Sequence, residues 1–439
     1  MKKSYEIPYG SSTTLFTLPG ELPTEIIAPR VVPAAADPVA EVVRALHSPC
    51  GNPPYGGTPN GSGAEPIAAQ LRRLAAVDAT VAVAVNDKTR PVPHGHLLPP
   101  LVAYLEELGF RKEKIVFVIA TGAHPVMTVD EYPSILPAEI LRNHRVECHD
   151  SHDPARLVSL GSTIRGTPAF FNRTYAEADV RVVVGNIEPH QFMGYSGGVK
   201  SAAIGLAGTQ TINVNHARML NPAARLGSYS DNPARADVEE LGRILGIHFA
   251  LNAVLNDHKQ IVNAFAGDPV AVMEAGIPLV RENFEVSIPV PFDLVIVSPG
   301  GHPKDINLYQ AQKALAHASI ITRDGGTIIL AASCPEGSGS GSYEKWVHDR
   351  HSNQEVVDQF RAEGFRVGPH KAFQIARDAL KARVILVSDM ADEIVRGFLL
   401  EPAGSVEEAF EMATGHSDKP LSIGIMPYAN ATIPRLSGA

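Results

Sequence analysis

The sequence predicts an α/β fold of two domains with mainly parallel sheets and an active-site cleft between the domains. Three observations support this prediction: short apolar runs alternate with helical patterns, two prolines break the chain late in its length, and ionisable residues follow several of the runs. Near-continuous apolar runs are typical of parallel strands buried on both faces. Their alternation with helices indicates α/β architecture.

The predicted strands are rich in valine and isoleucine and end in turn residues. They occupy residues 80–87, 114–122, 179–186, 293–301, 325–333 and 383–389. Helical patterns lie at 64–76, 98–109 and 353–364. Because two prolines near 285–292 precede a new strand, we expect a domain boundary there. The N-terminal domain would span 1–287 and the C-terminal domain 288–422, with segment 423–439 returning to the first domain.

Composition narrows the class of protein. The 439 residues are 44% hydrophobic, enough for a sizeable core, and the net charge of −9 disfavours binding to nucleic acid or to an anionic membrane. We find neither a membrane-length apolar run nor a signal peptide. Three widely spaced cysteines indicate a reducing, cytoplasmic environment. A small-molecule substrate is therefore expected, while assembly of identical chains stays open.

Ionisable residues follow three successive strands of the first domain. Asp87 and Arg90 come after the first strand, His124 after the second and His190 after the third. Ligands bind beyond the carboxyl ends of strands in open α/β sheets, and two histidines can act as acid and base on opposite sides of a substrate. Arg90 could hold a carboxylate, with Asp87 orienting its guanidinium. A local turn-stabilising Asp87–Arg90 ion pair is the alternative.

A glycine-rich turn precedes a small-residue helix at residues 194–208. Gly197, Gly198 and Ser201 could present free N–H groups to an anion at the helix start. Lys200 beside them could be a charge partner, a covalent nucleophile or a solvated side chain. Val199 precedes Lys200 where a Walker A loop has glycine, and no strand is followed by GxGxxG, so ATP hydrolysis and standard NAD binding are disfavoured.

Two further features are ambiguous when judged by spacing alone. Tyr309 and Lys313 share one face of a predicted helix, with Gln310 on a neighbouring face, so they are either ligand-facing or part of the packing. His216 has no second ligand at helical spacing, so a metal there would need other ligands from a cofactor.

The polar stretch around residues 143–156 carries a histidine- and cysteine-rich cluster, His144, Cys148, His149 and His152. It lacks the paired ligands of a structural zinc site. We interpret it as a surface strand and turn.

Five stretches together resemble the lactate racemase family of nickel-pincer-nucleotide-dependent 2-hydroxyacid racemases and epimerases. They are NDKTRP, ATGAH, GNIEPHQFMGYSGGVKS, NVNHARM and GGHPKDINLYQAQKAL. They run in order from about residue 80 to beyond residue 315. The resemblance implies a pyridinium 3,5-bisthiocarboxylic acid mononucleotide that carries nickel, and transient contact with the enzymes that make it. It implies reversible hydride transfer through a 2-keto acid.

The resemblance also implies a role for each matching residue. Lys200 would hold the cofactor covalently and His216 would bind nickel, while His124 and His190 would be acid and base. The remaining cofactor-binding residues would be Thr89, Gly197, Gly198 and Ser201. The substrate-binding residues would be Arg90, Lys313, Tyr309, Gln310 and Asp87.

Three departures put lactate itself in doubt as the substrate. The loop at 50–63 is long and polar, His302 follows a Gly-Gly pair, and Phe373 lies near a position where lactate racemases carry a bulkier aromatic. A malate racemase or a gluconate-like C2 epimerase of the same family is therefore an alternative. A non-catalytic protein that binds the nucleotide cofactor, an NAD dehydrogenase and a metal-dependent lyase are alternatives of other classes.

Overall fold

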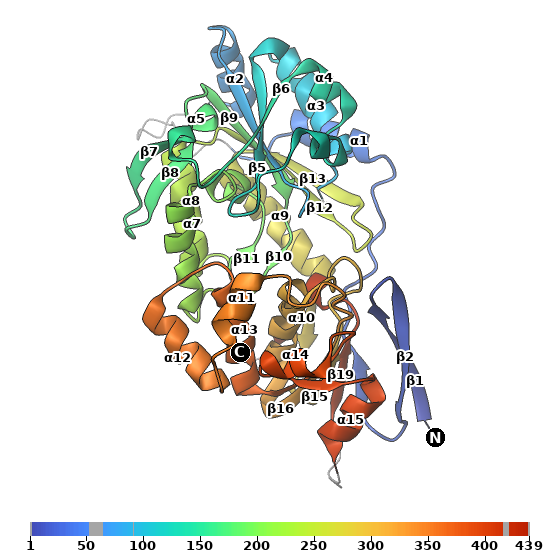
Figure 1. Ribbon diagram of the computed structural model, residues 1–439. Helices are drawn as coiled ribbons and strands as arrows, with labels where there is room; N and C mark the ends of the chain where they lie inside the picture. Colours follow the sequence, from blue (N-terminus) through green and yellow to red (C-terminus); the bar gives the residue numbers. More distant parts are fainter. Residues whose placement is uncertain (1, 52–64, 91, 416–420, 438–439) are drawn as a thin grey trace. The chain divides into compact units, whose positions relative to one another are not determined.

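The computed structural model describes residues 2–51, 65–90, 92–415 and 421–437 (Figure 1). The chain divides into two compact units. One unit comprises residues 31–282, and the other comprises residues 1–30 together with 283–439. Most of the long loop at 50–63 lies outside the described residues. No helix in the part of the chain that the structure describes is long and apolar enough to span a membrane.

The unit of residues 31–282 contains a six-stranded sheet. Its strands, in spatial order, are β13 (Ile261–Gly267), β12 (Phe249–Leu255), β9 (Val180–Asn186), β4 (Val81–Asn86), β5 (Ile115–Ala120) and β6 (Arg145–Cys148). All neighbouring pairs are parallel except β12 with β13. The predicted strands at 80–87, 114–122 and 179–186 are confirmed as β4, β5 and β9.

Successive residues of a strand face opposite sides of its sheet, so each face of β4 has its own packing partners. Val81, Val83 and Val85 share one apolar core with residues of α1 (Pro38–His47), α2 (Ile67–Ala75) and α3 (His94–Glu107). The short helix α6 (Lys200–Ala203) contacts β4 and β9, and α8 (Pro233–Leu245) contacts α6.

The remaining elements of this unit are smaller or peripheral. The helices are α4 (Ala138–Asn143), α5 (Arg173–Ala176), α7 (Thr209–His216) and α9 (Pro269–Phe284), whose last two residues belong to the other unit. The two-stranded pairs are β7 (Leu157–Ser162) with β8 (Pro168–Asn172), and β10 (Pro189–His190) with β11 (Gly194–Tyr195).

The other unit contains a second six-stranded sheet, which is parallel throughout. In spatial order its strands are β18 (Glu401–Ala403), β17 (Arg383–Val387), β16 (Thr322–Ala331), β15 (Phe292–Val297), β19 (Ile423–Met426) and β3 (Thr24–Ile26). One face packs against the hairpin of β1 (Lys2–Tyr9) and β2 (Ser12–Pro19) and against α15 (Val406–Thr414). Helices α10 (Leu308–Ile321) and α13 (Pro369–Lys381) also pack on this sheet. Its smaller elements are α11 (Gly341–Val347), α12 (Asn353–Glu363), α14 (Asp392–Gly397), β14 (Glu285–Ile288) and β20 (Ile433–Leu436).

The two chain ends differ from the sequence expectation. Segment 423–439 was expected to return to the N-terminal domain, but its strand β19 is fully buried between β15 and β3. Its other strand, β20, pairs with β14 of the same unit. Instead, the first thirty residues join the C-terminal unit, because β3 extends its sheet and the β1–β2 hairpin covers one face.

Candidate active site

The carboxyl ends of β4, β5 and β9 carry the ionisable residues that the sequence analysis selected in the first unit. Asp87 directly follows β4, His124 follows β5, and His190 follows β9. The three strands are neighbours in the order β9, β4, β5 and run parallel, so their carboxyl ends share one edge of the sheet. This is the edge at which open α/β sheets bind ligands.

Asp87 and His124 form a hydrogen-bonded pair at this edge. His124 Nδ1 lies 2.7 Å from Asp87 Oδ2, and the Thr89 hydroxyl donates to Asp87 Oδ1 at 2.7 Å. The Asp87 side chain is 4% exposed, whereas that of His124 is 44% exposed. A carboxylate only accepts, so Nδ1 of His124 carries a proton, and in the neutral form of the ring the lone pair lies on Nε2. In the neutral ring, Nε2 of His124 can therefore act as a base.

The pKa of Asp87 is low although the group is buried. Burial acts to raise this pKa, but the hydrogen bond and charge of His124, the Thr89 hydroxyl and the charge of Arg90 outweigh it. The expected role of Asp87 in orienting the Arg90 guanidinium stays a prediction. Both carboxylate oxygens already accept from His124 and Thr89, and Arg90 contributes its charge and a backbone N–H that donates to the Asp87 carbonyl at 3.1 Å.

His190 and His216 both pack against one phenylalanine, Phe192. His190 meets the Phe192 ring edge-on with centroids 4.9 Å apart, and Phe192 meets His216 in the same way at 5.2 Å. The backbone N–H of Met193 donates to His190 Nδ1 at 3.2 Å. When His190 is neutral, its proton therefore resides on Nε2. Phe192 is buried and was not selected by the sequence analysis.

His216 ends α7, and its neighbour Asn215 determines which ring nitrogen holds the proton. Asn215 Nδ2 donates to Asp237 Oδ2 at 2.8 Å and to the Ala234 carbonyl at 3.2 Å. The amide oxygen of Asn215 must therefore be the atom that faces His216 Nδ1, 3.2 Å away. It accepts the Nδ1 proton, which places the lone pair of His216 on Nε2. A histidine that binds a metal through Nε2 needs this tautomer.

The glycine-rich turn is held by hydrogen bonds within the protein. Helix α6 begins at Lys200 and has only four residues, and the Gly198 N–H already donates to Asn252 Oδ1 at 2.6 Å. The Ser201 hydroxyl donates to Asn86 Oδ1 at 3.2 Å. The Gly198 N–H is therefore used within the protein, while an anion site at Gly197 and Ser201 stays a prediction. These bonds fix the turn that carries Lys200.

Two contacts join this turn to the neighbouring strand ends. The bond from Ser201 reaches Asn86, the residue next to Asp87 in the chain. The Gly122 N–H, close to His124 in the chain, donates to the Gly205 carbonyl at 2.8 Å. The Lys200 turn is therefore attached to the ends of β4 and β5, which carry the Asp87–His124 pair.

The other unit places its predicted residues at the start of α10. Asn307 caps this helix and accepts from the Gln310 N–H at 3.1 Å. Lys313 Nζ donates to Gln310 Oε1 at 2.6 Å. The Lys371 ammonium on α13 lies 4.6 Å from the centre of the Tyr309 ring. These groups form one polar cluster, to which the sequence analysis had not assigned Lys371.

Two of the noted departures lie away from this cluster. Phe373 stacks on Phe360 with centroids 4.9 Å apart and is 3% exposed, so it belongs to the core. The aromatic group that does pack against Tyr309 is His370, at 5.8 Å between centroids. His302 is exposed, and its backbone N–H donates to the Gly10 carbonyl.

The histidine- and cysteine-rich stretch at 143–156 does not converge on one point. His149 is buried and bonds the Ala207 carbonyl at 3.0 Å, and burial lowers its pKa to about 4. His144 bonds the Lys112 carbonyl, and His152 lies beside Asp150. Within the described ranges, no three His, Cys, Asp or Glu side chains are arranged to hold a metal ion.

The fold and these strand-end groups define an α/β enzyme, and comparisons with known proteins identify its family. Residues 9–227 match the Lactate racemase N-terminal domain, and residues 288–433 match the Lactate racemase C-terminal domain. A lactate racemase from Thermoanaerobacterium thermosaccharolyticum is 31% identical over 98% of this chain and 99% of its own length. One from Lactiplantibacillus plantarum is 31% identical over 82% of this chain and 85% of its own length. The chain belongs to the lactate racemase family and is an isomerase.

Solved structures agree with this family. The lactate racemase apoprotein from T. thermosaccharolyticum superposes with a TM-score of 0.88 at 30% identity, covering 99% of this chain and 100% of that one. A protein from Thermotoga maritima shares the fold at 20% identity, with a TM-score of 0.62 over 84% of this chain and 97% of its own.

Proposed function

We propose that this isomerase racemises or epimerises a small 2-hydroxy acid by reversible hydride transfer at C2, through a 2-keto acid. The Asp87–His124 pair is the single observation that carries the proposal. Its buried carboxylate bonds Nδ1 of a half-exposed imidazole, so that the lone pair of the neutral ring lies on Nε2, the form needed to remove the hydroxyl proton. The relatives named lactate racemase support the same reaction class.

His190 is proposed as the partner of His124 because it follows the neighbouring strand β9 at the same sheet edge. The Met193 N–H on Nδ1 leaves the proton of neutral His190 on Nε2, where it can donate a hydrogen bond to the substrate oxygen. To deliver a proton, the ring must first be the imidazolium, which then returns to the neutral form. In the opposite direction of the reaction the two roles exchange. A racemase needs such a pair because the substrate must be approached from both of its faces.

The residues that would hold the nickel-pincer nucleotide fit that group in two respects. Lys200 stands on a turn that Asn252 and Asn86 fix through Gly198 and Ser201, which suits a covalent anchor. His216 presents the tautomer of a metal ligand, and a metal bound by one histidine takes its other ligands from the cofactor. When bound, the nucleotide supplies the acceptor and donor of the hydride.

Arg90 and Lys313 are proposed to hold the substrate carboxylate and the oxygen beside it. An arginine can bind a carboxylate through two parallel hydrogen bonds, which orients C2 as well as retaining the acid. Gln310 holds the Lys313 ammonium at 2.6 Å and so restricts where it can donate. Tyr309 would form part of the same surface.

Within this class, one observation favours a substrate with a second carboxylate, such as malate. Lys371 is 3% exposed and its ammonium lies 4.6 Å from the centre of the Tyr309 ring, with His370 on the same helix against that ring. Two nitrogen-bearing side chains beside a substrate-binding residue suit an anionic side chain better than the methyl group of lactate.

The test is intact mass and nickel content of the protein co-expressed with the cofactor-making enzymes, with Lys200→Ala as the control. We expect a nucleotide-sized mass increase and about one nickel per chain, both lost in the control, followed by racemisation of at least one acid in a chiral panel that includes lactate, malate and gluconate. A folded protein with neither adduct nor nickel would refute the cofactor assignment. A loaded protein inactive on the whole panel would favour the non-catalytic binding protein.

A further inference from the structure

A buried arginine hydrogen-bonds the backbone of the turn that carries Lys200. Arg235 lies on α8 and is 1% exposed. Its Nη1 donates to the Tyr195 carbonyl and its Nη2 to the Gly197 carbonyl, each at 3.1 Å. One guanidinium therefore binds two carbonyls on the three residues that lead into Gly198. Lysine, with a single point charge, could not reproduce this forked contact.

These two bonds set the direction of the neighbouring N–H groups. In a trans peptide the C=O and the following N–H point to opposite sides. Because Arg235 holds the Tyr195 carbonyl, the Ser196 N–H points away and donates to the Glu188 carbonyl at 2.8 Å. Because it holds the Gly197 carbonyl, the Gly198 N–H points away and donates to Asn252. Arg235 thus fixes two peptide planes of the turn that leads to Lys200, Tyr195–Ser196 and Gly197–Gly198.

The turn is shaped to fit this arginine. Gly197 and Gly198 have φ of +91° and +58°, which side chains rarely adopt. A Cβ on Gly198 would lie 2.8 Å from Arg235 Nη2 and 2.7 Å from Met273 Cγ. Glycine at this position therefore allows the backbone to approach the guanidinium closely.

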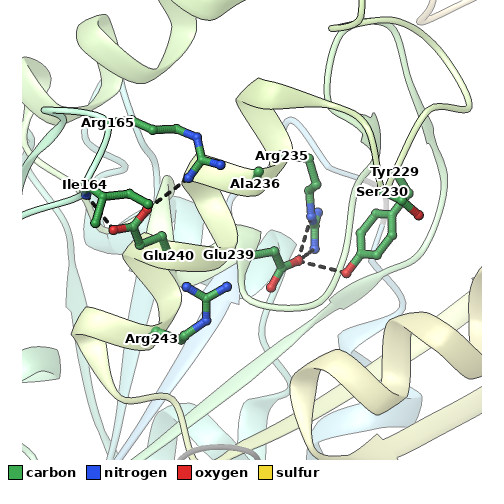
Figure 2. Close-up of a pocket in the computed structure, with 9 residues that line it drawn as sticks. All are labelled: Ile164, Arg165, Tyr229, Ser230, Arg235, Ala236, Glu239, Glu240 and Arg243. Atoms are coloured by element: carbon green, nitrogen blue, oxygen red, sulfur yellow. Dashed lines mark hydrogen bonds and ion pairs between the residues drawn. The ribbon is translucent and has the colours of Figure 1, made fainter.

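The buried charge of Arg235 is neutralised by Glu239, whose Oε1 also lies 2.6 Å from Nη2. Arg235 Nε donates to Glu239 Oε1 at 2.7 Å, and the Tyr229 hydroxyl donates to the same oxygen at 2.9 Å (Figure 2). The guanidinium carbon lies 5.0 Å from the centre of the Tyr229 ring. A surface pocket of about 360 Å³ opens over these groups and also borders Arg243. A buried cation is stable only when paired in this way.

We infer that Arg235 is a positioning residue for Lys200. The Tyr229–Glu239–Arg235 chain fixes the conformation of the two-glycine turn. The Lys200 amine is thereby held in place for covalent attachment of the cofactor. The second half of this inference rests on the proposed function. The first half concerns the turn alone and is tested without any cofactor.

The experiment compares Arg235→Lys with Arg243→Gln by hydrogen exchange of the protein without cofactor. Arg243 lines the same pocket and stands on the same helix, so it controls for loss of a cation there. In Arg235→Lys, losing the forked contact should speed exchange of the Ser196 and Gly198 amides about tenfold, while β4 and β5 keep their protection. In Arg243→Gln nothing should change at the turn. If Arg235→Lys does not fold, the same exchange measurement is made on Glu239→Gln, which keeps the Arg235 guanidinium but removes its counter-charge.

Intact mass after co-expression gives the second readout. We expect the fraction of chains carrying the adduct to fall about tenfold in Arg235→Lys and to match the wild type in Arg243→Gln. Unchanged exchange at the turn in a folded variant would overturn the inference, as would a uniform rise across α8, β4 and β5, which would mean that Arg235 only stabilises the fold. A wild-type protein without adduct would refute the proposed cofactor, and the exchange data would then decide the positioning role alone.

Discussion

Replacing Asp87 by asparagine tests the acid–base assignment most directly. The substitution keeps the size of the side chain, and removes the charge that bonds His124 Nδ1 at 2.7 Å. Hydrogen bonds to charged groups contribute about 1.5–3 kcal/mol. If this stabilisation is needed mainly when His124 becomes protonated during the reaction, kcat should fall roughly 10- to 150-fold. KM should change much less, because Arg90 and Lys313 would still hold the carboxylate.

The assay is racemisation of each enantiomer by the loaded protein, followed by chiral chromatography and normalised to the fraction of chains that carry the adduct. Asp150→Asn is the matched control, since Asp150 also lies beside a histidine, His152 at 3.7 Å, and is not a member of the Asp87–His124 pair. A kcat of Asp87→Asn within twofold of the wild type would refute the role of the pair. So would a rise in KM at constant kcat, which would indicate that Asp87 serves substrate binding.

The same substitution has a pH signature in stability. The folded protein holds the pKa of Asp87 below its unfolded value, so the ionised group stabilises the fold above an unfolded pKa of about 3.9. This contribution is lost as pH falls through the lower, folded pKa. The difference in the free energy of unfolding between wild type and Asp87→Asn should therefore be largest near neutral pH and should shrink in acid. Denaturant unfolding from pH 7 down to pH 3 measures it.

Three further outcomes are expected. Asn215→Asp should lower bound nickel by roughly 10-fold or more, measured by metal analysis, because the amide that orients His216 also donates to Asp237 and a carboxylate there would repel it. Lys371→Met should lower kcat/KM for malate at least about tenfold relative to lactate in the chiral panel. Burial raises the pKa of Asp268 to about 6, so stability falls as pH rises from about 4 to 6; Asp268→Asn should remove this fall in denaturant unfolding.

The strands of both sheets were predictable where the sequence is continuously apolar. The β4 strand, VAVAVN, and the β15 strand, FDLVIV, are buried on both faces, and this pattern leaves few alternatives to a parallel sheet. It was harder to predict which of the two sheets the N-terminal strands join. Nothing in the composition of the β1–β2 hairpin or of β3 tells which of two sheets they join, because either sheet could accept an added edge strand.

The candidate site was predictable as a set of strand ends, but its internal bonds were not. The position of His124 after β5 follows from the rule for carboxyl ends, whereas its partner could have been any nearby acid. Proximity in sequence favoured the pairing of Asp87 with Arg90, yet the parallel neighbours β4 and β5 bring Asp87 to His124 instead. Asn252 gave a weaker signal, as the polar residue within the apolar strand FALNAVL, and it accepts from the Gly198 amide.

The polar neighbours of His124, His190 and His216 explain why the site contains buried polar groups. An imidazole near neutral pH can hold its proton on either nitrogen, and water alone would leave both forms populated. Here a carboxylate, a backbone N–H and an amide oxygen each bond Nδ1, of His124, His190 and His216 respectively. The first and third leave a lone pair on Nε2, and the second leaves a proton there. A lone pair on Nε2 suits a base or a metal ligand, and a proton on Nε2 suits a hydrogen-bond donor to the substrate oxygen. Exchanging any one neighbour for a group of opposite polarity should therefore reverse the tautomer of its histidine alone.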